Sequence, residues 1–294
     1  MAAYKKIEIA VSVCALLLCC AAARAQETPK GHLFIIGGGD RTDPVMTRFV
    51  ELAGGSSARI VIVPQASEEE QDAIQGQAKQ FKRLGAASAE GVIFKKGDAD
   101  KKENLAKFKD AGGVFFSGGD QVRLVAFLAG TKMLEEIRRI YREGGVVGGS
   151  SAGAAIMSKV MLTGDDRMEV DGESFTAIRS SSVVVAEGFG FLPPYIVADQ
   201  HFLKRKRENR LISVVLEHPG LTGIGIDEAT AFIVSPDGTG QVLGNSLVSV
   251  YETFNAGPIT RDESGHLAAR GITLHLLKSG DTYDLKKAAP EAVK

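Results

Sequence analysis

Gly149-Ser150-Ser151-Ala152-Gly153 has the G-x-S-x-G pattern of a nucleophile elbow. Before it, Val146-Val147 indicates a short buried strand that follows a predicted helix over 132–143. After it, helical spacing of apolar residues resumes over 154–162. We therefore expect a sharp strand-to-helix turn at Ser151. The flanking glycines would let neighbouring backbone approach a residue whose hydroxyl points outwards.

A catalytic role explains the glycine-rich segments of this chain better than chance or nucleotide binding does. A chain with 34 glycines can produce such a pentapeptide by chance, but the predicted strand before it and helix after it favour catalysis. Neither the phosphate-loop pattern nor the dinucleotide pattern G-x-G-x-x-G occurs, because Gly37-Gly38-Gly39 is followed by Asp40-Arg41-Thr42. A nucleotide-binding fold is thus not supported.

Residues 1–25 have the features of a secretory signal peptide. Lys5 and Lys6 precede an apolar run over 9–23 that is short for a membrane span, and Ala23-Arg24-Ala25 fits signal-peptidase cleavage. We expect cleavage after Ala25 and a secreted or periplasmic protein with no stable membrane span. The alternative, a lipid anchor on Cys19 or Cys20, is weaker because a small residue normally precedes a lipid-modified cysteine.

The composition excludes several classes of partner and cofactor. All three cysteines lie in the leader, so the mature chain is expected to have neither disulfides nor cysteine metal sites. Removal of the leader changes the formal net charge from −1 to −3, which does not indicate a nucleic-acid partner. No His-Glu-x-x-His motif or tight histidine cluster is present, and we expect no metal and no other cofactor.

Residues 26–294 are expected to form one α/β domain. Strands are predicted over 32–36, 59–64, 91–94, 114–117 and 146–148, and they alternate with helices over 43–53, 68–84 and 121–128. This alternation predicts a mostly parallel sheet with helices on both faces. Beyond about residue 222, short strands separated by turns predict antiparallel additions to the same sheet.

His201 is the expected general base for Ser151. It follows the apolar run over 195–198 and precedes a predicted helix over 205–216, so it stands at the end of a strand, where open α/β sheets place their ligands. The other histidines of the mature chain have ordinary positions in strands or turns. They are His32, His218, His266 and His275.

The carboxylate that orients His201 is harder to choose. Several acidic residues lie near one partner or the other in the sequence, and the residues alone leave Asp166, Glu169 and Asp199 open. The full set of nearby acids is Asp165, Asp166, Glu169, Asp171, Glu173 and Asp199.

Backbone N–H groups are expected to form the oxyanion hole. Ala152 follows the nucleophile directly, and Gly119 or Asp120 would supply a second donor from a loop in which Asp120 is a natural helix N-cap. Beyond His201, Arg207 and Arg210 lie three residues apart in a predicted helix. This pair would hold a substrate carboxylate in bidentate geometry, unless the basic run is simply solvated.

Motifs along nearly the whole mature chain, in order, resemble those of the cyanophycinase family. They are Gly118-Gly119-Asp120-Gln121, the elbow with Ala154, Gly188-Phe189-Gly190-Phe191-Leu192, Asp199-Gln200-His201-Phe202 with Arg205, Arg207 and Arg210, and Gly225-Ile226-Asp227-Glu228. The wider family contains serine peptidases, including aspartyl dipeptidases, with a fold similar to class I glutamine amidotransferases.

The resemblance implies roles for individual residues. Ser151 matches the family nucleophile and His201 the family base, and a family glutamate after the elbow helix favours Glu169 as the third member. The positions that match substrate contacts are Gln121, Asp199, Gln200, Arg207 and Arg210. Ser150 departs from the family pattern, in which threonine is common, but keeps the hydroxyl.

The implied activity is that of an exopeptidase that cleaves cyanophycin, a polyaspartate carrying arginine on its side chains, into β-aspartyl-arginine dipeptides. Asp171 or Glu173 would hold guanidinium groups of that polymer. The alternatives are an exported aspartyl or isoaspartyl dipeptidase and a non-catalytic binding protein on the same scaffold. Family members are commonly dimers, so the resemblance also implies a homodimer.

Overall fold

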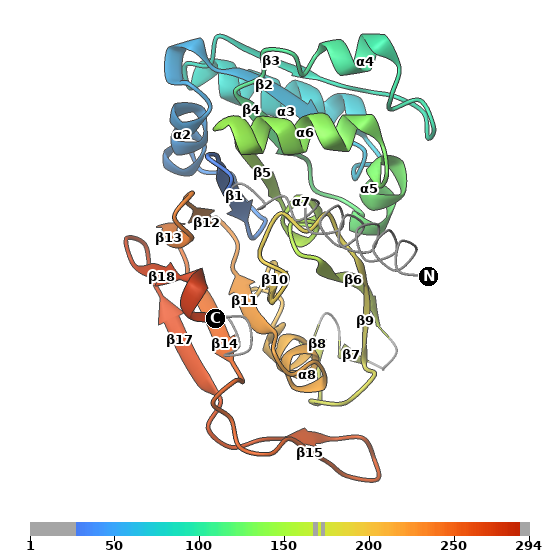
Figure 1. Cartoon of the computed structure of the whole chain (residues 1–294), viewed down its shortest axis with the longest axis vertical. Helices are drawn as coiled ribbons and strands as arrows, with labels where there is room; N and C mark the ends of the chain where they lie inside the picture. The colour runs from blue at the N-terminus through green and yellow to red at the C-terminus, as the bar shows by residue number, and fades with distance from the viewer. Residues whose placement is uncertain (1–27, 167–169, 172–173, 289–294) are drawn as a thin grey trace, which may run out of the picture.

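The strand that leads to Ser151 lies inside the main sheet of the molecule. The computed structural model describes residues 28–166, 170–171 and 174–288. In it, β5 (Val146–Ser150) pairs in parallel with β1 (His32–Ile36) and with β4 (Gly113–Phe116). The sheet continues in parallel through β2 (Arg59–Val63) to β3 (Ser88–Gly91) at one edge (Figure 1).

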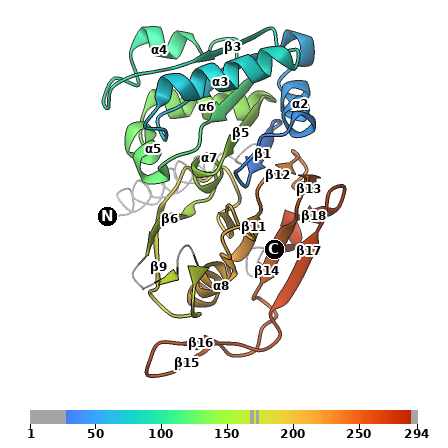
Figure 2. The same ribbon diagram turned by 180° about the vertical axis from the view of Figure 1, so that it is seen from behind.

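Helices cover both faces of this sheet because successive strand side chains point in opposite directions. Leu33 and Ile35 pack in one core cluster with side chains of α5 (Gln121–Leu128) and α6 (Lys132–Glu143). Phe34 and Ile36 pack in a second cluster with α2 (Asp43–Leu52) and α3 (Glu70–Arg83). Accordingly, α6 lies in front of the sheet in Figure 1, and α3 lies in front when the molecule is turned in Figure 2. The predicted α/β class with a mostly parallel sheet is confirmed.

The C-terminal strands divide between two sheets. β12 (Thr230–Val234), β13 (Thr239–Gly244) and β18 (Thr282–Asp284) extend the main sheet with antiparallel pairing beyond β1. The prediction that the strands beyond about residue 222 add to that sheet is right for these three and wrong for three others, which form a separate sheet with one earlier strand, and α8 (Glu208–Glu217) packs on that sheet. These strands are β10 (Ile196–Asp199), β11 (Thr222–Ile226), β14 (Val248–Glu252) and β17 (Thr273–Leu277).

Short elements complete the described chain. They are η2 (Gly55–Ser57), α4 (Lys102–Ala106), α7 (Ala152–Ala155), β6 (Val160–Asp166), β7 (Val170–Asp171), β8 (Ser174–Phe175), β9 (Val183–Glu187), β15 (Thr260–Arg261), β16 (Leu267–Ala268) and η3 (Leu285–Ala288). Over the described ranges, no helix is both long and apolar enough to span a bilayer. The predicted leader, residues 1–25, lies outside those ranges.

A strand and a helix illustrate how the predicted bounds differ from those in the structure. The strand expected over 91–94 is Ser88–Gly91, and the apolar side chains of Val92 and Phe94 are buried in the loop that follows it. The helix expected over 154–162 ends at Ala155. Its next carbonyl groups accept hydrogen bonds from another segment, Ile156 from Phe189 N–H and Met157 from Leu192 N–H, each at 2.8 Å. Those bonds replace continuation of the helix.

Candidate active site

Ser151 occupies a sharp turn between β5 and α7. Its φ of 56° and ψ of −110° lie outside the conformations that most residues adopt. The flanking glycines make this turn sterically feasible. A Cβ on Gly149 would lie 2.7 Å from Gly153, and a Cβ on Gly153 would lie 2.5 Å from the Phe116 carbonyl oxygen. The G-x-S-x-G pattern therefore corresponds to a tight strand-to-helix elbow.

The Ser151 hydroxyl begins a continuous series of hydrogen bonds. Ser151 Oγ lies 2.9 Å from His201 Nε2, and His201 Nδ1 lies 2.6 Å from Glu228 Oε1. His201 is 8% exposed and has a positive φ of 49° in the turn after β10. A hydroxyl, an imidazole and a carboxylate in this order form the arrangement of a nucleophile, its base and the group that orients the base.

Glu228, rather than the expected Glu169, is the carboxylate observed against His201. Glu169 lies outside the described residues, as does the side chain of Asp166, and Asp199 is engaged elsewhere. Glu228 reaches His201 because β10 and β11 pair in parallel, with Asp199 opposite Gly225. The carboxyl ends of parallel strands meet at one edge of a sheet, and this is the sequence signal that would have pointed to Glu228.

The Gly37-Gly38-Gly39 loop packs directly against His201 and Glu228. A Cβ on Gly38, whose φ is 119°, would lie 2.2 Å from His201 Cε1, and one on Gly39 would lie 2.8 Å from Glu228 Cβ. The backbone N–H of His201 also donates to the Gly37 carbonyl oxygen at 2.6 Å. These glycines, which fit no nucleotide motif, thus give the imidazole and its carboxylate room to meet.

The surroundings of His201 favour its neutral form. Burial lowers the pKa of His201 below its ordinary value, and the positive charges of Arg205 and Arg207 act in the same direction. The hydrogen bond to Glu228 opposes them without overcoming them. A neutral imidazole at physiological pH is the form that can accept a proton from a serine hydroxyl.

Two backbone N–H groups near Ser151 are suited to an oxyanion. Within the described ranges, neither Ala152 N–H, at the start of α7, nor Gly119 N–H donates to an acceptor. The Asp120 N–H, in contrast, donates to the Ala66 carbonyl oxygen at 2.9 Å and is not available as the second donor. The carboxylate of Asp120 caps α5 by accepting from Val122 and Arg123 N–H, as predicted.

A cavity of about 400 Å³ opens at Ser151. Three of the residues expected to bind substrate line it, namely Gln121, Gln200 and Arg207, together with Arg205. Gln121 Nε2 donates to the carbonyl oxygens of Leu162 and Thr163, which fixes β6 at the rim. Arg207 Nη1 donates at 2.8 Å both to the backbone oxygen and to Oε1 of Gln200.

Asp199 and Arg210 form a buried ion pair instead of lining this cavity. They are 2% and 3% exposed, and Arg210 donates to both carboxylate oxygens of Asp199, with Nε at 2.8 Å from Oδ2. Arg207 is the N-cap residue of α8, and its Nη1 lies 4.0 Å from Asp199 Oδ1, so both arginines approach this carboxylate although only Arg207 lines the cavity. Arg205, which the family motif contains but to which no substrate contact was assigned, also lies at the cavity.

No group of three or more histidine, cysteine or acidic side chains could hold a metal ion within the part of the chain that is described. The cavity at Ser151 is lined by two carboxylates, Asp120 and Asp165, as well as by glutamine and arginine side chains. Ser151, His201 and Glu228 are the side chains whose hydrogen bonds suit nucleophilic and acid–base chemistry.

The α/β fold and this hydroxyl–imidazole–carboxylate series define a serine hydrolase. The chain belongs to peptidase family S51, whose model matches residues 33–242. It is 35% identical to a cyanophycinase of Synechococcus elongatus over 265 residues, which cover 87% of this chain and 80% of that protein. A cyanophycinase of Trichormus variabilis is 35% identical over 275 residues, with 89% and 88% covered. One of Geminocystis herdmanii is 32% identical over 273 residues, with 90% and 97% covered.

Solved structures support the fold. A peptidase from an acI-B1 Actinobacterium matches with a TM-score of 0.65 at 24% identity, covering 88% of this chain and 98% of its own. A putative peptidase E protein from Listeria monocytogenes matches with a TM-score of 0.51 at 17% identity, covering 73% and 98%. The family membership makes this chain a cyanophycinase-like serine peptidase, as the sequence motifs implied.

Proposed function

We propose that this chain is an exported exopeptidase that hydrolyses cyanophycin to β-aspartyl-arginine dipeptides. The hydrogen-bonded series from Ser151 through His201 to Glu228, in a cavity lined by arginines, is the observation that carries the proposal. The cyanophycinases named above, at 32 to 35% identity, support the choice of polymer.

The hydrogen-bonded positions of Ser151, His201 and Glu228 suit acyl transfer to the serine. As Ser151 Oγ attacks the scissile carbonyl carbon, His201 Nε2 takes its proton, and Glu228 stabilises the resulting imidazolium through Nδ1–H. Ala152 and Gly119 N–H groups donate to the oxyanion. His201 then gives the proton to the leaving amine, and water attacks the acyl-enzyme by the reverse series of steps. Glu228 thus takes the role that the family pattern suggested for Glu169.

Charges around the cavity are complementary to the repeat unit of the polymer. Each unit carries one free carboxylate and one guanidinium group. Arg205 and Arg207 offer positive charge and Asp165 offers negative charge at the same cavity. The contacts from Gln200 hold the Arg207 guanidinium in a fixed orientation, which suits bidentate binding of a carboxylate.

The test is to incubate protein comprising residues 26–294 with insoluble cyanophycin and with short aspartyl and isoaspartyl peptides, and to identify the products by mass. We expect β-aspartyl-arginine from the polymer, and a loss of several orders of magnitude in folded Ser151→Ala or His201→Ala protein. Cleavage of short peptides alone would instead assign an aspartyl dipeptidase. Failure of Ser151 to react with a serine-directed phosphonate would indicate a non-catalytic binding protein.

Export is a separate part of the proposal and rests on the sequence of residues 1–25. Sequencing the N-terminus of protein secreted by its host should give Gln26. A lipid-modified Cys19 or Cys20 would replace this proposal with a membrane anchor.

A further inference from the structure

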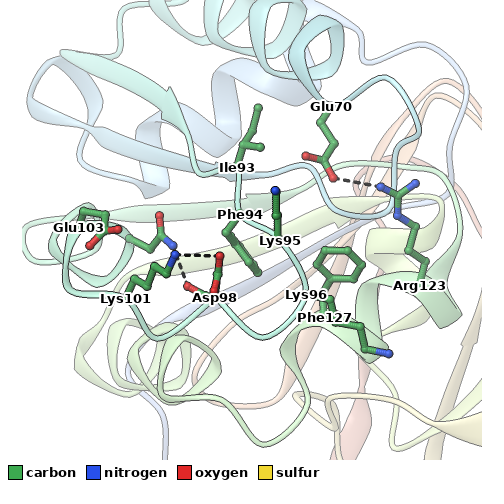
Figure 3. A pocket seen from close by; sticks show the side chains of 11 residues that line it. Glu70, Ile93, Phe94, Lys95, Lys96, Asp98, Lys101, Glu103, Arg123 and Phe127 are labelled. Atoms are coloured by element: carbon green, nitrogen blue, oxygen red, sulfur yellow. Dashed lines mark hydrogen bonds and ion pairs between the residues drawn. The ribbon is translucent and has the colours of Figure 1, made fainter.

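A second cavity, of about 830 Å³, lies near the active-site cavity at the edge of the main sheet. It is formed by the first turn of α3, the loop after β3, the start of α4 and side chains of α5. Phe94 and Phe127 lie next to each other in its centre, with ring centroids 6.1 Å apart (Figure 3). Nothing in the proposed acyl-transfer chemistry uses these residues.

Charged side chains of both signs surround this aromatic pair. Arg123 and Glu70 form an ion pair of 3.1 Å at one end of the view in Figure 3, and Lys101 and Asp98 form one of 2.9 Å at the other. Lys95 and Lys96 also line the cavity and are exposed. In the described part of the chain, neither of these two ammonium groups has an ion-pair partner.

One helix connects this cavity to the active site. Val122 of α5 lines the active-site cavity, whereas Arg123 and Phe127 line the second one. Val122 and Phe127 are about 7.5 Å apart along the helix axis, at 1.5 Å per residue. An extended chain advances about 3.3 Å per residue, so a polymeric substrate is long enough to pass around α5 from one cavity to the other.

The rims of both cavities carry exposed apolar side chains. Val122 beside the first cavity and Ile93 beside the second are each 40% exposed. Large apolar side chains in such positions provide a surface for the methylene groups of a long charged side chain whose head stays in water.

We propose that the second cavity is an accessory subsite for a distant repeat of the polymeric substrate. This inference rests on the proposed function. Lys95 and Lys96 bind the free carboxylate of a repeat unit, the exposed carboxylate of Glu103 receives its guanidinium group, and Ile93 with Phe127 covers the methylene groups between them. The polymer is thereby held at two points while Ser151 cleaves it.

The experiment measures binding without turnover. Full-length mature protein with Ser151→Ala is sedimented with insoluble cyanophycin, alone and combined with Lys95→Ala/Lys96→Ala. We expect the dissociation constant to rise roughly 3- to 10-fold, since exposed ion pairs are individually weak. The matched control is Lys79→Ala/Lys82→Ala, which removes the same charge from the exposed surface of α3 and should leave binding unchanged.

Two further measurements separate the possible failures. With Ser151 intact, Lys95→Ala/Lys96→Ala protein should react with a small fluorophosphonate at the wild-type rate, because the triad is untouched. If this variant also binds and degrades the polymer as wild-type protein does, the proposed subsite is wrong and the proposed function stands. If wild-type protein neither binds nor degrades the polymer, both the subsite and the proposed function are wrong. An equal loss of binding to polyaspartate without arginine would show a general polyanion site and overturn recognition of the zwitterionic unit.

Discussion

His201 Nδ1 lies 2.6 Å from Glu228 Oε1, and the two residues follow strands that run side by side in parallel. Because the hydrogen bond occupies Nδ1, the proton-free nitrogen of the neutral ring is Nε2, which faces Ser151 Oγ. The carboxylate therefore selects the tautomer that can act as base. The hydrogen bond between Ser151 and His201 also links two sheets, since Ser151 follows a strand of the main sheet and His201 follows a strand of the smaller one.

Replacing Glu228 by Gln should lower kcat by about 10³- to 10⁴-fold, because an amide can neither fix this tautomer nor stabilise the imidazolium. Glu169→Gln is the matched comparison, and its kcat should stay within a few-fold of wild type. Both variants are assayed on cyanophycin after thermal unfolding has shown that they fold. The opposite ranking would return the orienting role to Glu169.

The sequence predicted the parts of this site that depend on local pattern. The elbow at Ser151 and the position of His201 after a strand follow from residues adjacent in the chain, as does the Asp120 cap. The family resemblance covered Glu228 within Gly225-Ile226-Asp227-Glu228, yet its role depends on which strands pair. The strands β10, β11, β14 and β17 form a separate sheet. Local periodicity in the sequence cannot predict this, because it does not show which distant strands pair.

Gly38 illustrates the same limit at a smaller scale. From the sequence, the three glycines after the first strand show only that no nucleotide-binding motif is present, whereas in the structure the ring of His201 fills the space that a side chain on Gly38 would need. Arg207 and Arg210 give a second example. Their spacing alone predicts two residues that bind substrate together, whereas in the structure Arg207 lines the cavity and Arg210 is buried in an ion pair with Asp199.

Gly38→Ala should reduce kcat/KM at least about 100-fold, because its Cβ would lie 2.2 Å from the His201 ring and displace it from Ser151. Gly76→Ala is the control, since Gly76 lies in α3 with open space around it. That change should leave activity intact and stabilise the protein by about 0.5 to 1 kcal/mol. Fluorophosphonate labelling rates and thermal unfolding measure the two effects. Wild-type labelling of the Gly38→Ala protein would contradict the packing argument.

The pH dependence of kcat/KM should respond to Arg205. The charge of Arg205 lowers the pKa of His201, so Arg205→Gln should raise that pKa. The base works only when neutral, and activity falls as pH drops through its pKa. The acidic limb of the profile should therefore move to higher pH in the variant. Lys79→Gln, a distant loss of charge, should not move it. A limb that stays in place or moves to lower pH in Arg205→Gln protein would argue against this electrostatic coupling.

Arg207→Lys and Arg210→Lys should have different consequences, although both keep the charge and lose the planar fork. Arg207 lines the active-site cavity, so its change should cost roughly 10- to 100-fold in kcat/KM on the β-linked aspartyl-arginine polymer. Hydrolysis of a small neutral ester, which has no carboxylate to bind, should change little. Equal losses on both substrates would mean that Arg207 supports the loop of His201 through Gln200 instead of binding substrate.

Arg210→Lys should act mainly on stability. Arg210 donates to both oxygens of the buried Asp199 carboxylate, and a lysine can satisfy only part of that geometry. We expect a loss of about 1 to 3 kcal/mol in the free energy of unfolding, measured by urea denaturation, with polymer and ester activities of the folded fraction reduced together. Complete removal of the charge in Arg210→Met should cost more, about 3 to 5 kcal/mol, because it leaves the buried Asp199 carboxylate with only Arg207, 4.0 Å away, as a cationic neighbour. Polymer-specific loss in a fully stable Arg210→Lys protein would instead place Arg210 among the residues that bind substrate.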